Sequence, residues 1–210
     1  SHRRFLVDYF TGNYEGSLAA GLAFGRNSLT GDARISGSLA SLAGLQRALK
    51  NNDPDAINTA IKIILLLHGM ILSFGGIPML YYGDAIGTLN DDSYLNDESK
   101  NDDSRWIHRP KMDWKKALQR TQPGTVEYSI FNAVKKMISI RKEIPAFADR
   151  NNRELLSVDN PHLFVFSRFD QINSSSRVLV IGNFDDESQF LNLSPLQHMG
   201  FFQYDSVKNL

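Results

Sequence analysis

The stretch GGIPMLYYGD at residues 75–84 decides the fold prediction. Residues 77–83 are apolar throughout and have the length of a strand, as expected for a strand that is buried on both faces. Pro78 fits only near the start of such a strand, because proline cannot donate to the hydrogen-bond ladder. An apolar helix before the two glycines and a buried strand after them predict an α/β unit with a parallel sheet.

Helical periodicity extends this prediction in both directions along the chain. Residues 36–49 predict a helix with Ser36 as its N-cap. A second helix is expected from Pro54 to about residue 74, and its apolar second half predicts that it is largely buried. Residues 126–144 predict a third helix.

The two ends of the chain have a different character. Residues 1–34 are rich in glycine and aromatic side chains and are expected to form loops with short elements. After about residue 151, strand-like runs at 164–166, 178–181 and 190–193 predict a small all-β region.

Composition excludes several classes of protein. The 210 residues carry no net charge, which argues against a nucleic-acid or anionic-membrane binder. The chain has no cysteine, so disulfides, thiolate metal sites and cysteine nucleophiles are excluded. The most apolar stretch, residues 61–72, is too short to cross a bilayer, and no signal peptide opens the chain. Composition does not determine the cellular compartment of the protein, and we favour the cytoplasm.

The acidic segment from residue 84 to about 114 is the candidate site, because active sites of α/β proteins lie beyond the carboxyl ends of the strands. A metal site built from its aspartates is one interpretation, but a solvated loop is favoured. Asp84 is the best-placed acid, yet no second carboxylate is clearly opposite it. Arg105 can hold hydroxyls or a carboxylate, although the residues alone favour a structural salt bridge. His68 is expected in the core, and His108 remains ambiguous.

Several motifs resemble the amylosucrase family of the α-amylase superfamily. Residues 75–84 resemble the eighth barrel strand of the superfamily. Two stretches are similar to amylosucrases and the related sucrose hydrolases in particular: GTLNDD at 87–92 and KNDDSRWIHRP at 100–110. TGDARISG at 30–37 and HRRF at 2–5 also resemble that family, in the same order along the chain.

This resemblance implies a fold and a domain organisation. The fold class would be α/β: the C-terminal portion of a (β/α)8 barrel, with an insertion before its last strand and a small C-terminal β-sandwich domain. Residues 1–50 would form the insertion after barrel strand 7 and the start of the following helix. Residues 51–148 would complete the barrel, and residues 149–210 would form the all-β domain.

The resemblance also assigns roles to side chains. In the family's order, the nucleophile Asp, the acid/base Glu and the stabilising Asp all lie upstream of Ser1, so no catalytic residue is expected here. Arg105 matches the arginine that closes the glucosyl pocket, and Arg34 matches one on the fructosyl side. Arg3 and Phe5 match positions near the acceptor glucan.

One position departs from the superfamily. Ala85 follows the Gly-Asp pair of the strand-end motif, where the superfamily usually has Glu. The missing carboxylate could alter hydrogen bonding under the pocket.

The implied function is transfer of glucose from sucrose to an α-1,4-glucan with release of fructose. No cofactor or metal is implied, and the partners are sucrose and α-glucan, with neither nucleic acid nor membrane. The chain alone is expected to be inactive. Because its apolar sheet edges and faces would be unpaired, it is expected to self-associate, to rearrange, or to retain its missing parts as a separate chain. The alternatives are a sucrose hydrolase and a non-catalytic carbohydrate-binding or structural module that stacks sugars on its aromatic start.

Overall fold

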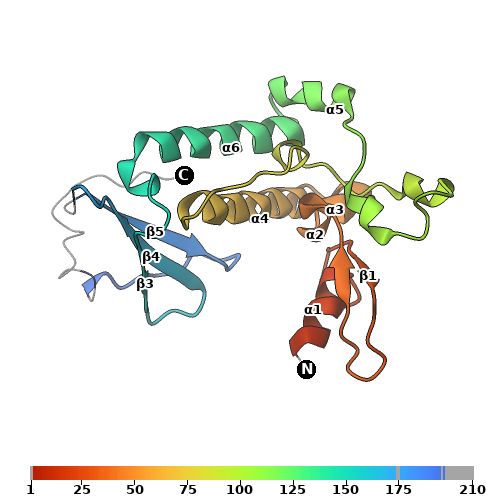
Figure 1. The fold of residues 1–210 in the computed structure, drawn as a ribbon, viewed down its shortest axis with the longest axis horizontal. Coiled ribbons are helices and arrows are strands. Elements are labelled where there is room, and N and C mark those ends of the chain that lie inside the picture. Colours follow the sequence, from red (N-terminus) through yellow and green to blue (C-terminus); the bar gives the residue numbers. More distant parts are fainter. Residues whose placement is uncertain (1, 174–175, 195, 197–210) are drawn as a thin grey trace. The chain divides into compact units, whose positions relative to one another are not determined.

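The computed structural model describes residues 2–173, 176–194 and 196 (Figure 1). The chain forms two compact units. The first comprises Ser1–Leu65 and Leu80–Asn132, and the second comprises Leu66–Met79 and Ala133–Leu210.

Two expectations fall partly on positions outside the described residues. Ser1, upstream of which the catalytic acids are expected, is one such position, and the statement that the chain holds no catalytic residue stays a prediction. Residues 197–210, the end of the expected all-β domain, also lie outside the described residues.

The first unit opens with a helix, α1 (His2–Phe10), where loops were expected. A short antiparallel pair follows, β1 (Leu22–Phe24) and β2 (Arg34–Ser36), and β2 contacts α1 (Figure 1).

The helix predicted for residues 36–49 is wrong in its bounds and its cap. It is two helices, α2 (Leu39–Leu42) and α3 (Leu45–Asn51). Gly44 separates them with a φ of 95°, a left-handed conformation that favours glycine. The N-cap is Ser38, whose side-chain oxygen accepts the amide of Ser41 at 3.2 Å.

The predicted second helix is confirmed as α4 (Pro54–Ser73). The carboxylate of Asp53 accepts the amides of Asp55 and Ala56 at 3.1 and 3.0 Å and so caps its first turn. The expectation that its apolar half is largely buried is wrong. Its buried apolar residues and His68 form one narrow stripe at four-residue spacing, and other apolar side chains, such as Ile63 and Ile71, are exposed.

The length argument against a membrane span does not hold for α4. At 20 residues the helix is long enough to cross a bilayer, and its most apolar window has a mean hydropathy of 1.7. Only 28% of that window is buried. A core helix of a soluble protein meets the same criteria, so this single helix is weak evidence for a membrane location.

The strand predicted for residues 77–83 is absent. The segment has no regular structure up to Tyr81 and then turns into η1 (Asp84–Ile86). Burial on both faces is also wrong, because Ile77 and Met79 are 72% and 83% exposed. An extended apolar segment becomes a strand only when neighbours accept and donate its backbone hydrogen bonds. Within the described part of the chain, no strand pairs with it.

The acidic segment is ordered by aspartate caps. It contains three short 3₁₀ turns, η1, η2 (Asp92–Asn96) and η3 (Ser104–His108), before α5 (Trp114–Leu118) and η4 (Gln119–Thr121). Asp91, Asp103 and Asp113 each accept a backbone amide at the start of the element that follows. These carboxylates therefore act in local structure.

The third predicted helix is confirmed as α6 (Val126–Glu143), followed by η5 (Pro145–Phe147). The second unit then forms a three-stranded antiparallel sheet of β3 (Arg153–Leu156), β4 (Leu163–Phe169) and β5 (Arg177–Asn183). The runs at 164–166 and 178–181 are confirmed as strands. The run at 190–193 is not a strand, since no partner pairs with it among the described residues.

The core of the second unit combines apolar and polar burial. Phe147, Phe166 and Val180 are buried, and Phe74 packs against them. Arg168 is fully buried beside this cluster, with its guanidinium carbon 5.7 Å from the ring centre of Phe147.

The described residues thus contain mixed helices and two small antiparallel sheets. The parallel sheet expected around residues 77–83 is absent from them, and the β-region is a single sheet there. The described residues close no barrel, so the assignment to a (β/α)8 barrel stays a prediction.

Candidate functional site

Arg105 lies at the second position of η3 and is held by the cap of that turn. Its Nε donates to both carboxylate oxygens of Asp103 at 2.8 and 3.0 Å, and its Nη2 donates to Oδ2 at 2.8 Å. This pairing lowers the pKa of Asp103 to about 2 and raises the pKa of Arg105. The arginine side chain remains 60% exposed. Arg105 therefore forms a local salt bridge, as the residues around it in the sequence predicted, and its guanidinium is still exposed to solvent.

Arg34 opens β2, where its backbone pairs with Phe24. The residue is exposed, and within the described residues it forms no ion pair. Its planar donors are thus available to an incoming ligand.

Arg3 and Phe5 lie on α1. Arg3 forms an exposed ion pair of 3.3 Å with Asp32, which precedes β2 in the chain. Phe5 stands edge-on to Tyr14, with 5.1 Å between ring centres, and also contacts Tyr9 at 5.9 Å. Phe5, Tyr9 and Tyr14 are partly exposed and offer aromatic surface to solvent.

The first unit brings the elements that carry these four residues next to one another. The helix α1 contacts β2, and β2 contacts η3. Arg34 and Arg105 are 71 positions apart in the sequence, yet they lie on neighbouring elements. Their roles in binding remain predictions.

Asn90 is a positioning residue that sequence reasoning missed. Its Oδ1 accepts the amide of Ser38 at 2.7 Å, and its Nδ2 donates to the carbonyl of Ala20 at 2.6 Å. Its own amide donates to Ser41 Oγ at 2.9 Å. Asn90 therefore ties the turn after β2 to the acidic segment. The only signal in the sequence was its place in the GTLNDD motif.

A small cavity lies beside these ties. It measures about 180 Å³ and is lined by the Gly37–Leu39 turn, Tyr81, Asp84, Thr88 and His108. The buried Nδ1 of His108 has no hydrogen-bond partner. Burial also lowers the pKa of His108, and the positive charge of Arg109 lowers it further. The imidazole that faces this region is therefore neutral at pH 7.

The metal site and His68, two other candidates from the sequence, gain no support as functional sites. Within residues 2–173, 176–194 and 196, no group of three or more potential ligand side chains could hold a metal. His68 is 1% exposed, as expected of a core histidine.

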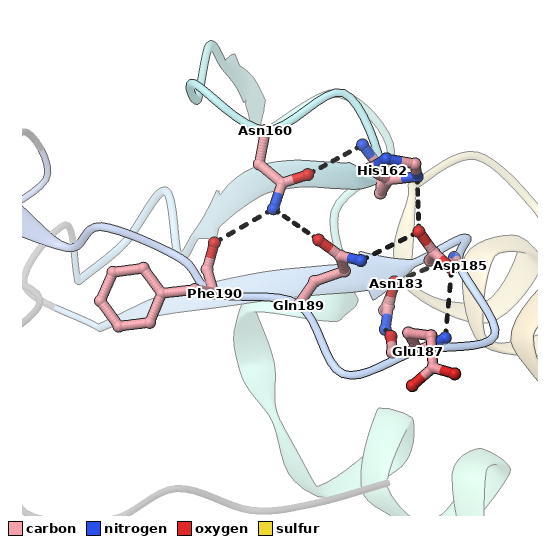
Figure 2. A network of polar contacts seen from close by, with 7 residues as sticks. All are labelled: Asn160, His162, Asn183, Asp185, Glu187, Gln189 and Phe190. Atoms are coloured by element: carbon pink, nitrogen blue, oxygen red, sulfur yellow. Dashed lines mark hydrogen bonds and ion pairs between the residues drawn. The ribbon is translucent and has the colours of Figure 1, made fainter.

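In the second unit, a network of polar residues is held together by hydrogen bonds among its own members (Figure 2). His162 Nδ1 lies 2.7 Å from Asp185, and Gln189 links Asp185 to Asn160. Because its members bond to one another, the network fixes the loop after β5 against the start of β4.

No known protein-family model matches this chain.

Proposed function

We propose that this chain is the C-terminal part of a sucrose-acting glucosyltransferase of the α-amylase superfamily. The parent enzyme would transfer glucose from sucrose to an α-1,4-glucan and release fructose. The order of the motifs along the chain supports this proposal. The single structural observation that carries it is the contact of β2 with η3, because it puts Arg34 and Arg105 on adjacent elements.

In this proposal the chain binds and positions the substrate, and the part of the enzyme upstream of Ser1 supplies the catalytic carboxyl groups. Retaining glycoside chemistry needs a carboxylate nucleophile and a carboxylic acid that protonates the leaving oxygen. Arg105 would support the glucosyl side and Arg34 the fructosyl side. The exposed apolar residues Ile77 and Met79 also support the proposal, since a segment that becomes a buried strand only in the complete enzyme would expose such side chains when its partners are missing.

The test compares two proteins, the 210-residue chain and the complete reading frame that encodes it. Fructose release from sucrose is expected from the complete protein and not from the chain. Absence of release from the complete protein would refute the proposal. Product analysis then separates transfer to glucan from hydrolysis, which is the alternative within the same superfamily.

A non-catalytic carbohydrate-binding module is the second candidate. The observation that favours it is the partly exposed aromatic cluster of Phe5, Tyr9 and Tyr14. Sugars stack on such rings through their apolar faces. Titration of the chain with maltooligosaccharides tests this candidate: tight binding that Tyr14→Ala abolishes would favour the module, and no binding would favour a site that needs the rest of an enzyme.

A further inference from the structure

A contact between His162 and Asp185 joins two segments of the second unit. His162 directly precedes β4, and Asp185 lies two residues beyond the end of β5. Nδ1 of the imidazole and Oδ2 of the carboxylate are 2.7 Å apart (Figure 2). An ionised carboxylate has no proton to donate, so Nδ1 carries the proton and donates it. The contact therefore ties the loop after β5, residues 184–190, to the start of β4.

Three donors converge on the Asp185 carboxylate. Besides the imidazole, the amide of Glu187 donates to Oδ1 at 3.1 Å, and Nε2 of Gln189 donates to Oδ2 at 2.9 Å. The Glu187 amide is the main cause that lowers the pKa of Asp185, and a hydrogen bond with Asp186 and the charge of His162 add to it. The carboxylate therefore keeps its negative charge in the range around pH 6.5 where histidines ordinarily titrate.

The hydrogen bonds continue from Asp185 to the far end of the loop. Oε1 of Gln189 accepts Nδ2 of Asn160 at 3.0 Å, and the same Nδ2 donates to the carbonyl of Phe190 at 3.1 Å. The ring of Phe190 is 84% exposed. A change at Asp185 therefore affects how firmly the loop holds an aromatic side chain at the surface.

The surroundings of this contact make the imidazole the group whose charge changes near neutral pH. The side chain of His162 is 51% exposed, so protons reach it from solvent, whereas Asp185 is 17% exposed. Among the described residues, Asp186 is the other ionisable side chain that acts on the Asp185 carboxyl. Carboxyl groups ordinarily titrate near pH 4, well below histidine. The α4 side chains nearest to the end of β5 are those of Met70 and Leu66, which carry no charge.

We propose that His162 and Asp185 form an acid-strengthened clamp, in which protonation of the imidazole fastens the loop of residues 184–190 to the start of β4. When the imidazole is neutral, its N–H donates to the carboxylate. After protonation, a cation donates to the same anion, and charge-assisted hydrogen bonds are the stronger ones. The added stabilisation is complete where the imidazole is fully protonated, and it is lost as the pH rises through the titration of the imidazole.

The experiment measures amide hydrogen exchange of the loop in the 210-residue chain at pH 5.5 and pH 7.5 by rapid-mixing mass spectrometry. Each rate is divided by the intrinsic rate at the same pH. Protection of residues 184–190 should be about threefold greater at pH 5.5, a modest gain because half-exposed ion pairs contribute little.

Two variants test the cause. His162→Asn places a neutral N–H close to the position of Nδ1 and cannot become charged, so it should keep the protection seen at pH 7.5 and lose the gain at pH 5.5. Asp185→Asn removes the anion and should give low protection at both pH values. Protection of β5 shows that each variant is folded.

The matched control is His2→Asn, the same substitution at an exposed histidine of the first unit. It should keep the full pH dependence of the loop. The proposal is overturned if the unmodified chain gains no protection at pH 5.5, if the gain persists in either folded variant, or if peptides from α6 gain equally, since the effect would then belong to the whole fold. These outcomes do not depend on fructose release by the complete protein.

Discussion

Replacing Arg168 with alanine should selectively unfold the second unit. Arg168 Nε donates to Asn152 Oδ1 at 2.8 Å, and its other nitrogens donate to the carbonyls of Ser73 and Asp149. Burial is the main cause that lowers the pKa of this arginine, and the charge of Arg141 adds to it. Within the described residues no carboxylate forms a salt bridge with Arg168, so neutral oxygens stabilise the guanidinium.

The expected loss in the free energy of unfolding follows from the acceptors that lose their hydrogen-bond donor. The alanine leaves the buried oxygens of Asn152 and Ser73 and the partly buried carbonyl of Asp149 without this donor, and each buried oxygen costs about 1–3 kcal/mol when unsatisfied. We therefore expect a loss of about 3–5 kcal/mol, the lower part of the range that three such acceptors give together. Since domains are stable by only about 5–15 kcal/mol, much of the stability of this unit would be lost.

Hydrogen exchange measured by mass spectrometry is the suitable assay. Both tryptophans, Trp106 and Trp114, lie in the first unit, so tryptophan fluorescence does not report on the sheet. Peptides from β4 and β5 should exchange about 100-fold faster in Arg168→Ala, which corresponds to about 3 kcal/mol. Peptides from the first unit serve as the internal reference.

Two further variants isolate the cause. Arg150→Ala removes an exposed arginine of the second unit, three residues before β3, and should leave the exchange unchanged. Arg168→Met keeps most of the volume but not the donors, and it should behave like alanine. If exchange in β4 and β5 stays within threefold of the unmodified chain for both Arg168 variants, the buried hydrogen bonds do not stabilise this unit.

Three other predictions concern the first unit. The Asp103 carboxyl should titrate near pH 2 by carbon NMR, and Arg105→Ala should return its pKa toward 3.8. Because folding lowers this pKa, the pair stabilises the fold above about pH 3.8 and loses that effect as the pH falls to about 2, so a normal Asp103 titration would contradict the pairing. Tyr82→Phe should lower the pKa of Tyr81 from about 12 toward 10 in an ultraviolet phenolate titration, and an unchanged midpoint would show that the Tyr82 hydroxyl is not the cause. Gly87→Ala should cost about 2 kcal/mol in denaturant unfolding, since φ is 62° and a Cβ would lie 2.7 Å from Ile130 Cδ1. Gly124→Ala, also at positive φ but in open space, should cost less, and equal losses would count against the packing argument.

Local signals in the sequence determined the long helices and two of the strands. The cap from Asp53 and the apolar periodicity of residues 54–73 lie within the helix that they specify, so α4 could be predicted. The same holds for α6, and for β4 and β5, whose runs of alternating and β-branched residues are separated by turn residues. The prediction of one helix over residues 36–49 failed, because Gly44 adopts a left-handed conformation and separates two shorter helices there.

The tertiary structure decided whatever depends on distant partners. Residues 77–83 have the composition of a buried strand, but a strand exists only where neighbours complete its hydrogen bonds. The four candidate site residues were assigned by resemblance, and their elements meet only because α1, β2 and η3 pack together. The cavity could not be predicted from the sequence for the same reason. Its polar lining residues lie up to 70 positions apart, from Ser38 to His108. Only the folding of the chain determines which residues line a common space.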